Sequence, residues 1–201
     1  IAGLVKGAST GEGLGNKFLG NIRETDAILH VLRCFDDDNV VHVDGQVNPV
    51  RDKEIIDTEL QIKDLETIDS RISKVQKQAQ TGGDKTAKLT YGVLAKYKEA
   101  LEKGISAREV TFETKDEQQI AHDLFLLTNK PILYICNVDE ASALKGNHYV
   151  EEVREAVKNE DAELLVVAAK IESEIAEFET YDERKMFLEE LGLEESGVNR
   201  L

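Results

Sequence analysis

Three short apolar runs divide the chain into alternating strand-like and helix-like segments. The runs span residues 27–35 (AILHVLRCF), 132–136 (ILYIC) and 163–169 (ELLVVAA). Continuous apolar runs of this length are typical of strands buried on both faces of a parallel sheet. Segments with helical periodicity accompany them, at residues 16–24, 116–127, 148–159, 172–179 and 182–191. The order strand, helix, strand, helix, strand, helix predicts an α/β fold, a parallel sheet with right-handed crossovers.

A different pattern interrupts this order after residue 50. Apolar residues recur there at intervals of three and four, at Leu65, Ile68, Ile72, Val75 and Ala79. This spacing predicts an antiparallel or coiled-coil helix that begins at Arg51 and ends near Gln80. The sequence TGGD at residues 81–84 then predicts a helix end, a tight turn and the N-cap of a second helix that reaches Lys103.

We therefore expect an inserted helical hairpin arm at residues 51–112. The α/β core would consist of residues 1–50 on one side of the insertion and residues 113–201 on the other. The polar faces of both arm helices are dense in Lys, Glu and Gln. Such a hairpin is either a solvated arm or an arm that binds a partner, and the pattern leaves both readings open.

Charge and composition exclude some classes of protein. A net charge of −15 over 201 residues argues against a nucleic-acid footprint that covers the whole surface, although it leaves room for a local basic patch. We expect no direct binding to DNA. No apolar run reaches the length of a membrane span, and no signal peptide is visible. Cys34 and Cys136 lie far apart in apolar runs and are expected to be buried thiols of a soluble cytoplasmic protein.

The first 20 residues contain six glycines and begin with Ile1 instead of a methionine. This glycine content permits a loop that bends closely around a ligand. Because the apolar start resembles the end of a buried strand, we expect the chain to be a fragment of a longer protein.

Ligands of an open α/β sheet bind beyond the carboxyl ends of the strands. A candidate loop follows the apolar start of the chain, the second apolar run and the third apolar run. Gly3 follows the first residues in IAGL, Asn137 begins NVDE after the second apolar run, and Ala168 begins AAKIE after the third. The three loops together predict one ligand site.

The motifs in these loops resemble the YchF-type branch of the Obg-like ATPases. The resemblance rests on IAGLVKGASTGEGLGNKFLGNIRETDAI, RCFDDDNVVHVDGQVNP, GGDK and NVDE, and it covers essentially the whole chain. It implies a P-loop NTPase core (a G domain) with an inserted helical hairpin, and hydrolysis of ATP without a strict preference for GTP. It also implies a further C-terminal TGS domain, association with ribosomes, and ATP or GTP with Mg²⁺ as ligands of the full-length protein.

Two features of that family are missing from the sequence. The aspartate of the DxxG motif would lie just before Ile1, and no GxxxxGK[ST] loop occurs, although its backbone N–H groups and lysine bind the phosphates. We therefore expect these 201 residues alone to be N-terminally truncated and inactive, with no cofactor and no metal bound.

The NVDE loop bears on the choice of nucleotide. In GTPases an Asn-Lys-x-Asp loop places a carboxylate that accepts two hydrogen bonds from guanine. Here Glu140, one methylene longer, takes the aspartate position and Val138 takes the lysine position. The resemblance implies that Asn137, Val138 and Glu140 form a relaxed or ATP-preferring base site. The alternative is a polar loop after a strand.

Further site residues follow from the same resemblance. Phe35 would pack its ring near the purine, although a core aromatic is an equal alternative. Ala169, Lys170 and Ile171 would contact the base mainly through their backbone. Gly3 would sense the γ-phosphate.

Catalysis is expected to involve the loops near Leu4 and His42. Leu4 takes the position where many relatives have a water-orienting glutamine, and a leucine cannot hydrogen-bond water. The resemblance implies that His42 orients the water instead, since a neutral imidazole can do so near pH 7. A solvent-exposed loop histidine is the alternative. His30, His122 and His148 are expected to be structural.

The sequence supports an enzyme, an ATPase or GTPase, as the first reading of the full-length protein. The alternative is a nucleotide-gated binding module, or a scaffold, whose helical arm docks a ribosomal or protein partner. A third reading, an α/β scaffold that binds no nucleotide, is not excluded by the residues alone.

Overall fold

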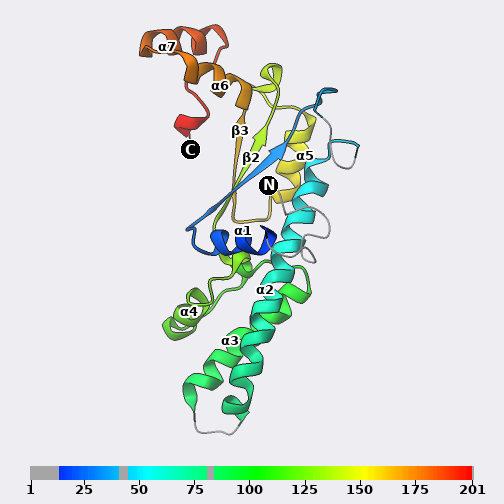
Figure 1. Ribbon diagram of the computed structural model, residues 1–201, viewed down its shortest axis with the longest axis vertical. Coiled ribbons are helices and arrows are strands. Elements are labelled where there is room, and N and C mark those ends of the chain that lie inside the picture. Colours follow the sequence, from blue (N-terminus) through cyan, green and yellow to red (C-terminus); the bar gives the residue numbers. More distant parts are fainter. Residues whose placement is uncertain (1–13, 41–44, 81–83, 201) are drawn as a thin grey trace. The chain divides into compact units, whose positions relative to one another are not determined.

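The computed structural model describes residues 14–40, 45–80 and 84–200. Its described strands form one sheet in the order β1-β2-β3 (Figure 1). They are β1 (Ile28–Arg33), β2 (Ile132–Asn137) and β3 (Glu163–Val167). β1 and β3 lie within the predicted apolar runs, and β2 extends one residue beyond its run, to Asn137.

The strands run in parallel, as the sequence predicts. β2 and β3 pair in parallel register, with Cys136 opposite Val166 and Asn137 opposite Val167. At the start of β1, Ile28 N donates to Pro131 O (2.9 Å), and at its end Cys34 N donates to Asn137 O (2.8 Å). The residue numbers rise along both strands between these two bonds, so β1 and β2 are parallel. The carboxyl ends of all three strands therefore lie at one edge of the sheet, where the candidate loops begin.

Seven α-helices accompany the strands in the described part of the chain. They are α1 (Leu14–Arg23), α2 (Pro49–Gln80), α3 (Lys85–Glu102), α4 (Lys115–His122), α5 (His148–Val157), α6 (Ala169–Glu177) and α7 (Tyr181–Glu190). Side-chain caps fix several helix starts: Asp84, Thr114, Asn147 and Thr180 each accept a hydrogen bond from a first-turn backbone N–H. Thr114 and Thr180 form complete capping boxes with a glutamate three residues later.

The chain divides into two compact units. The first comprises Ile1–Ile28 and Glu54–Pro131, and it contains the helical hairpin. The second comprises Leu29–Lys53 and Ile132–Leu201, and it contains the sheet. Each unit has its own set of buried residues.

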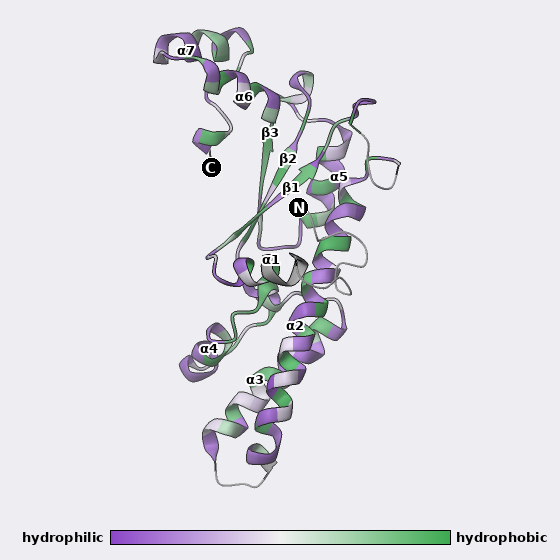
Figure 2. Ribbon diagram, viewed as in Figure 1, coloured by the Kyte–Doolittle hydropathy of each residue, from purple (hydrophilic) through white to green (hydrophobic). Residues whose placement is uncertain are grey.

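The predicted hairpin is formed by α2 and α3, which lie side by side in the first unit (Figure 1). Apolar residues of both helices pack into one cluster with residues of the segment 107–126, and Figure 2 shows hydrophobic (green) and hydrophilic (purple) positions interleaved along the two helices. The buried members are Ile68, Val93, Leu94, Tyr97, Leu101, Ala107, Ala121, Leu124 and Leu126, with Leu65, Ile72 and Val75 partly buried around them. The three-and-four spacing read from the sequence is thus the buried stripe of α2.

A buried carboxylate that the sequence analysis missed joins α2 of this hairpin to residues 127 and 128. Asp64 on α2 is fully buried and accepts hydrogen bonds from the backbone N–H groups of Leu127 and Thr128 and from Thr128 Oγ1, all at 2.8 Å. Burial raises the pKa of Asp64, and these three donors and the charge of Arg23 oppose the rise. Asp64 lies one helical turn from Leu60 and one from Ile68, so its place on the apolar stripe was visible in the sequence.

One strand differs from its prediction. β1 was expected to be buried on both faces, but Leu29 and Val31 are 54% and 60% exposed, whereas Leu32 is 2% exposed. Successive side chains of a strand point to opposite faces. β1 is an edge strand of the described sheet, and in the described part of the chain the face that bears Leu29 and Val31 is left open.

Two element boundaries also differ. The helix expected at residues 116–127 ends at His122, because Phe125 adopts a φ of 51° and a short 3₁₀ turn follows at Leu127–Asn129. The strand expected at residues 163–169 ends at Val167, since Ala169 begins α6.

The cysteine prediction is confirmed, since Cys34 and Cys136 are both free and buried. A hydrogen bond between the two thiols and burial raise the pKa of Cys34. Within the described ranges, no helix has the length and apolar character that crossing a membrane requires.

Candidate functional site

Two of the predicted loops meet at the carboxyl edge of the sheet in the second unit. Asn137 is the last residue of β2, and its Oδ1 accepts a hydrogen bond from Ala169 N at 3.0 Å. The backbone N–H of Val138 donates to Val167 O at 2.9 Å. The loop after β2 and the start of α6 after β3 are therefore held together by one side-chain and one backbone bond.

Glu140 and Lys170 face each other across the same two loops. The Lys170 Nζ lies 3.0 Å from Glu140 Oε1, with side chains 71% and 46% exposed. The hydrogen bond to Glu140 raises the pKa of Lys170. Asp139 fixes the turn between them and β2, since its Oδ1 accepts from Ser142 N at 2.8 Å and caps a 3₁₀ turn at Glu140–Ser142. Because the pair is exposed, water or a ligand can replace either partner at low cost.

The remaining predicted base-site residues contribute mainly backbone. Val138 and Ile171 are 3% and 1% exposed, so their side chains belong to the core. Ala169 is exposed and presents the N–H that Asn137 accepts. Residues 169–171 form the first turn of α6, and N–H groups of a helix start favour partial negative charge.

Phe35 lies after β1 and is only partly buried. The guanidinium of Arg33 lies 4.8 Å from the centre of the Phe35 ring, and Arg33 Nε donates to Phe35 O at 3.0 Å. The other Arg33 nitrogens donate to Asp37 O and Val40 O. Arg33 thus shapes the loop that follows β1 and supports one face of the aromatic ring.

Asn147 is a site-shaping residue that the sequence analysis did not select. Its Nδ2 donates to Cys34 O at 2.8 Å and to Ser142 Oγ at 3.3 Å, while its Oδ1 caps α5 through Val150 N. It therefore ties the end of β1 to the loop after β2. The Gly146-Asn147 pair ahead of a helical pattern is a typical capping sequence and was the available clue.

A hollow of about 510 Å³ opens in the second unit beside the loop after β1. Asp36, Asp37, Asp38 and Arg33 line it, together with Tyr149 of α5, whose hydroxyl donates to Asp36 Oδ1 at 2.9 Å. That hydrogen bond raises the pKa of Tyr149. The hollow is strongly acidic on one side, so a phosphate group has no favourable place beside the three aspartates.

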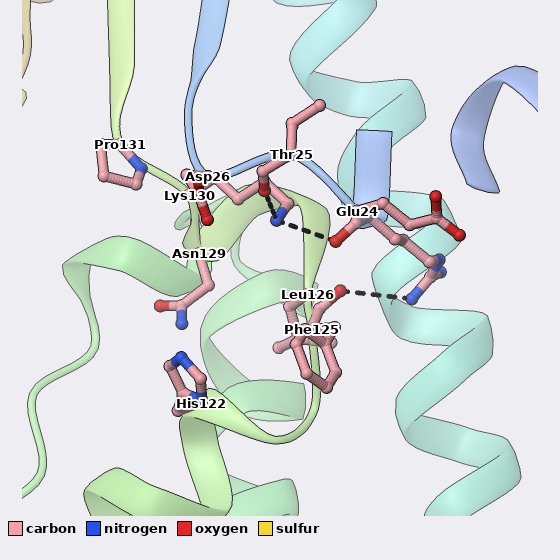
Figure 3. A pocket seen from close by; sticks show the side chains of 10 residues that line it. Glu24, Thr25, Asp26, His122, Phe125, Leu126, Asn129, Lys130 and Pro131 are labelled. Atoms are coloured by element: carbon pink, nitrogen blue, oxygen red, sulfur yellow. Dashed lines mark hydrogen bonds between the residues drawn. The ribbon is translucent and has the colours of Figure 1, made fainter. Parts of the chain in front are cut away.

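A second hollow, of about 220 Å³, lies in the first unit at the foot of the hairpin (Figure 3). Its two cations are already engaged: the Lys130 ammonium donates to the carbonyl oxygens of Arg23 and Thr25, and the Arg23 guanidinium donates to Thr67 Oγ1 (2.8 Å) and Phe125 O (3.4 Å). His122 at the end of α4 also lines this hollow, with a side chain that is 75% exposed. The hollow contains none of the predicted site residues.

The phosphate and catalytic side of the site cannot be placed in the same way. Gly3, Leu4 and His42 lie outside the described residues. In the described ranges, no group of His, Cys, Asp or Glu side chains is arranged to hold a metal ion.

Comparison with known proteins gives one consistent relationship. No protein-family model matches the chain. The chain is 53% identical, over its whole length, to the ribosome-binding ATPase YchF of Bacillus subtilis, and 49% identical to that of Escherichia coli O157:H7. Over 96% of its length it is 40% identical to Obg-like ATPase 1 of Caenorhabditis elegans.

The fold agrees with this relationship. The structure of the Schizosaccharomyces pombe YchF GTPase matches 99% of the chain with a TM-score of 0.83 and 31% sequence identity. The predicted fold class, a parallel-sheet NTPase core with a helical hairpin, is thereby confirmed. The chain spans about half the length of these relatives, between 49% and 55% of each.

Proposed function

Because this chain is homologous along its whole length to the YchF-type Obg-like ATPases, we propose that it forms the base-recognition part of their nucleotide-binding domain. The whole protein would bind ATP, hydrolyse it, and associate with ribosomes in the cytoplasm. The chain itself contains no GxxxxGK[ST] sequence, so these 201 residues alone are expected not to hydrolyse ATP.

One observation supports the proposal most directly. The bond between Asn137 Oδ1 and Ala169 N joins the loops after two neighbouring parallel strands at their carboxyl ends. Ligands of open α/β sheets bind at that edge. Polar side chains that are exposed and already paired with one another, as Glu140 and Lys170 are, suit a site where a ligand exchanges with internal partners.

The preference for ATP follows from the position of Glu140. A guanine presents two adjacent N–H donors, and an aspartate carboxylate accepts both. Glu140 is longer by one methylene, and its carboxylate is paired with the Lys170 ammonium at 3.0 Å. Adenine has an acceptor at N1 and no 2-amino group, so a base site without that bidentate acceptor does not penalise it.

The test is a competition between ATP and GTP for the full-length protein, measured by calorimetry. We expect ATP to bind at least about tenfold more tightly, a difference of roughly 1.4 kcal/mol. A Glu140→Asp variant has the shorter carboxylate side chain of the GTPase loop, and its ratio of GTP affinity to ATP affinity should rise. A strong GTP preference of the unaltered protein would rule out this reading of Glu140, and failure to bind either nucleotide would rule out the function.

We propose that His42 orients the attacking water, with Gly3 close to the γ-phosphate and Leu4 unable to replace a glutamine. Single-turnover hydrolysis by the full-length protein tests this role. A His42→Ala variant should lose roughly 10²–10⁴-fold in rate with ATP affinity retained. If the rate is unchanged, the water is positioned by another group.

A further inference from the structure

Two of the loops predicted to contact the base leave the sheet of the second unit at neighbouring strands. β1 ends at Arg33 and β2 ends at Asn137, and the bond from Cys34 N to Asn137 O (2.8 Å) joins the two ends. Phe35 follows directly in one loop, and Glu140 lies three residues beyond Asn137 in the other. The position of the Phe35 ring relative to the Glu140 carboxylate therefore depends on what holds the two loops together beyond the strand ends.

Asn147 connects these two loops through its side-chain amide. Its Nδ2 donates to Cys34 O at 2.8 Å and to Ser142 Oγ at 3.3 Å. Cys34 immediately precedes Phe35, and Ser142 ends the 3₁₀ turn that begins at Glu140. One amide nitrogen thus joins the backbone next to the predicted purine contact to the turn that carries the predicted base-reading carboxylate.

The orientation of this amide is determined by its partners. A carbonyl oxygen such as Cys34 O only accepts a hydrogen bond, and a backbone N–H such as that of Val150 only donates one. Nδ2 must therefore face Cys34, while Oδ1 faces Val150 N at 3.2 Å and caps α5. An asparagine makes both bonds at once, whereas an aspartate caps a helix equally well but carries no donor.

The backbone ahead of Asn147 is shaped to present this amide. Gly146 N donates to Ser142 O at 2.8 Å, which closes the loop after β2, and Gly146 adopts a φ of 73°. A Cβ at Gly146 would also lie 3.3 Å from the Cβ of Val150. Glycine is favoured at such a position. The Asn147 amide therefore extends from a closed turn on one side and from a capped helix on the other.

Replacement of the amide by a carboxylate separates its two bonds. Asn147→Asp keeps an acceptor for Val150 N, but its second oxygen faces Cys34 O, and the two negative oxygens repel each other. Because Cys34 is buried and Asn147 is partly buried, water screens this repulsion only in part. We expect the end of β1 and the loop after β2 to move apart in this variant while α5 remains capped.

We propose that Asn147 is a positioning residue of the nucleotide site, which sets the separation between the Phe35 ring and the Glu140 carboxylate. The proposal rests on the proposed function and gives the start of α5 a part in it. When the two loops are no longer joined, the site is competent to bind a purine for only a fraction of the time, and the apparent affinity falls by that fraction. Discrimination between adenine and guanine requires the ring and the carboxylate to contact one base together, so the preference for ATP also weakens.

The test uses the full-length protein and the variants Asn147→Asp, Asn147→Ala and Thr180→Ala. Thr180 is the matched control, since it caps α7 of the same unit by accepting from Glu183 N and lies outside the two loops. Binding of ATP and of GTP is measured by calorimetry, and the melting temperature by circular dichroism. The two alanine variants each lose a helix cap and should melt below the unaltered protein, and Asn147→Asp should melt above Asn147→Ala.

Both Asn147 variants should lose at least about tenfold in ATP affinity, and their ATP and GTP affinities should become more nearly equal. Thr180→Ala should keep the affinity and the preference of the unaltered protein. Unchanged ATP binding by Asn147→Asp overturns the proposal, because a residue that only caps α5 gives that result. An equal loss of affinity in Thr180→Ala overturns it as well, since any weakened cap would then suffice. If the unaltered protein binds neither nucleotide, the proposed function fails, and the positioning role fails with it.

Discussion

In the first unit the polar side chain with the most internal hydrogen bonds, Asp64, is buried, whereas in the second unit the polar side chains of the candidate base site lie at the surface. Asp64 is fully buried and has three donors from its own chain. Asn137, Glu140 and Lys170 are partly or largely exposed; Asn137 accepts one bond from Ala169 N, and Glu140 pairs with Lys170. Both groups of residues join separate segments of sequence.

The difference in burial distinguishes residues that stabilise the fold from residues that can bind a ligand. A buried carboxylate with every donor in place cannot release its partners to a ligand without a large loss of stability. An exposed amide and an exposed ion pair can do so at small cost. We therefore expect substitutions in the first group to change stability, and substitutions in the second to change ligand binding.

The largest expected effect is the loss of Asp64. Asp64→Ala leaves Leu127 N, Thr128 N and Thr128 Oγ1 buried without an acceptor, which should cost about 3 kcal/mol or more in the free energy of unfolding. Urea denaturation followed by circular dichroism measures it. Asp64→Asn is the matched control, since it keeps an acceptor oxygen and the volume, and its loss should be smaller. A change under about 1 kcal/mol for the alanine variant would show that this carboxylate does not fasten the hairpin.

The same residue predicts a pH dependence. Burial raises the pKa of Asp64 above its ordinary value of 3.8, so the folded chain binds this proton more tightly than the unfolded chain. The resulting stability is complete below pH 3.8 and is lost as the pH rises through the folded-state pKa. The unfolding free energy of the unaltered chain minus that of Asp64→Asn should therefore fall with rising pH and then level off. A difference that rises with pH would mean that the three donors and Arg23 outweigh burial.

A pair of glycine substitutions sharpens the comparison further. A Cβ at Gly197 in the second unit would lie 2.9 Å from Val167 Cγ2 and 3.0 Å from Glu172 Oε1, whose carboxylate also accepts from Gly197 N at 2.6 Å. Gly197→Ala should cost about 1–3 kcal/mol in the free energy of unfolding. Gly92 in α3 has open space around it, so Gly92→Ala should instead add about 0.5–1 kcal/mol. Thermal unfolding of both variants measures whether stability falls in one and rises in the other. Stabilisation of both variants would contradict the packing described at Gly197.

The sequence predicted the fold well because the strongest patterns are also the most local ones. The α2 stripe from Leu65 to Val75 and the apolar runs at β2 and β3 depend on periodicity alone. The open face of β1 was missed, since exposure of Leu29 and Val31 is decided by what lies against the strand. Phe125 was missed because a phenylalanine at positive φ contradicts the usual preference for glycine.

The site was predictable in part. Asn137 and Glu140 were selected because a polar loop directly follows a buried strand and because its motif resembles a base-binding loop. The structure places that loop beside Ala169, and the role of the two residues in binding stays a prediction. Their partners within the site were not foreseen. The pair of Glu140 with Lys170, and the links from Asn147 to Cys34 and Ser142, join residues distant in sequence that only the folded sheet brings together.

A smaller effect is expected at Phe125, on the rim of the hollow in the first unit. Its φ of 51° is costly for any residue with a Cβ and free for glycine. Phe125→Gly should therefore be more stable than Phe125→Ala by about 1 kcal/mol, the reverse of the order expected at Gly92. Chemical denaturation of the two variants checks this order. If alanine is the more stable of the two, the left-handed conformation at this position is wrong.

The smallest effect on stability is expected at the ion pair of the second unit. Lys170→Ala removes an exposed partner of Glu140 and should leave the free energy of unfolding nearly unchanged. The nucleotide preference of the full-length protein should change more clearly, because Glu140 is then released. Lys158→Ala, which removes the exposed partner of Glu155, is the control and should change neither quantity. A large loss of stability in Lys170→Ala, without such a loss in Lys158→Ala, would mean that the pair of Glu140 and Lys170 stabilises the fold, as Asp64 does.

The most direct test of the central claim is backbone amide hydrogen exchange of the full-length protein with and without ATP. The account predicts that ATP protects residues 137–142 and 169–172, the two loops joined by Asn137 and Ala169, and leaves residues 85–102 of the hairpin unchanged. Protection confined to the hollow at residues 122–131, with no change in the two loops, would contradict the assignment of the base site to the carboxyl edge of the sheet.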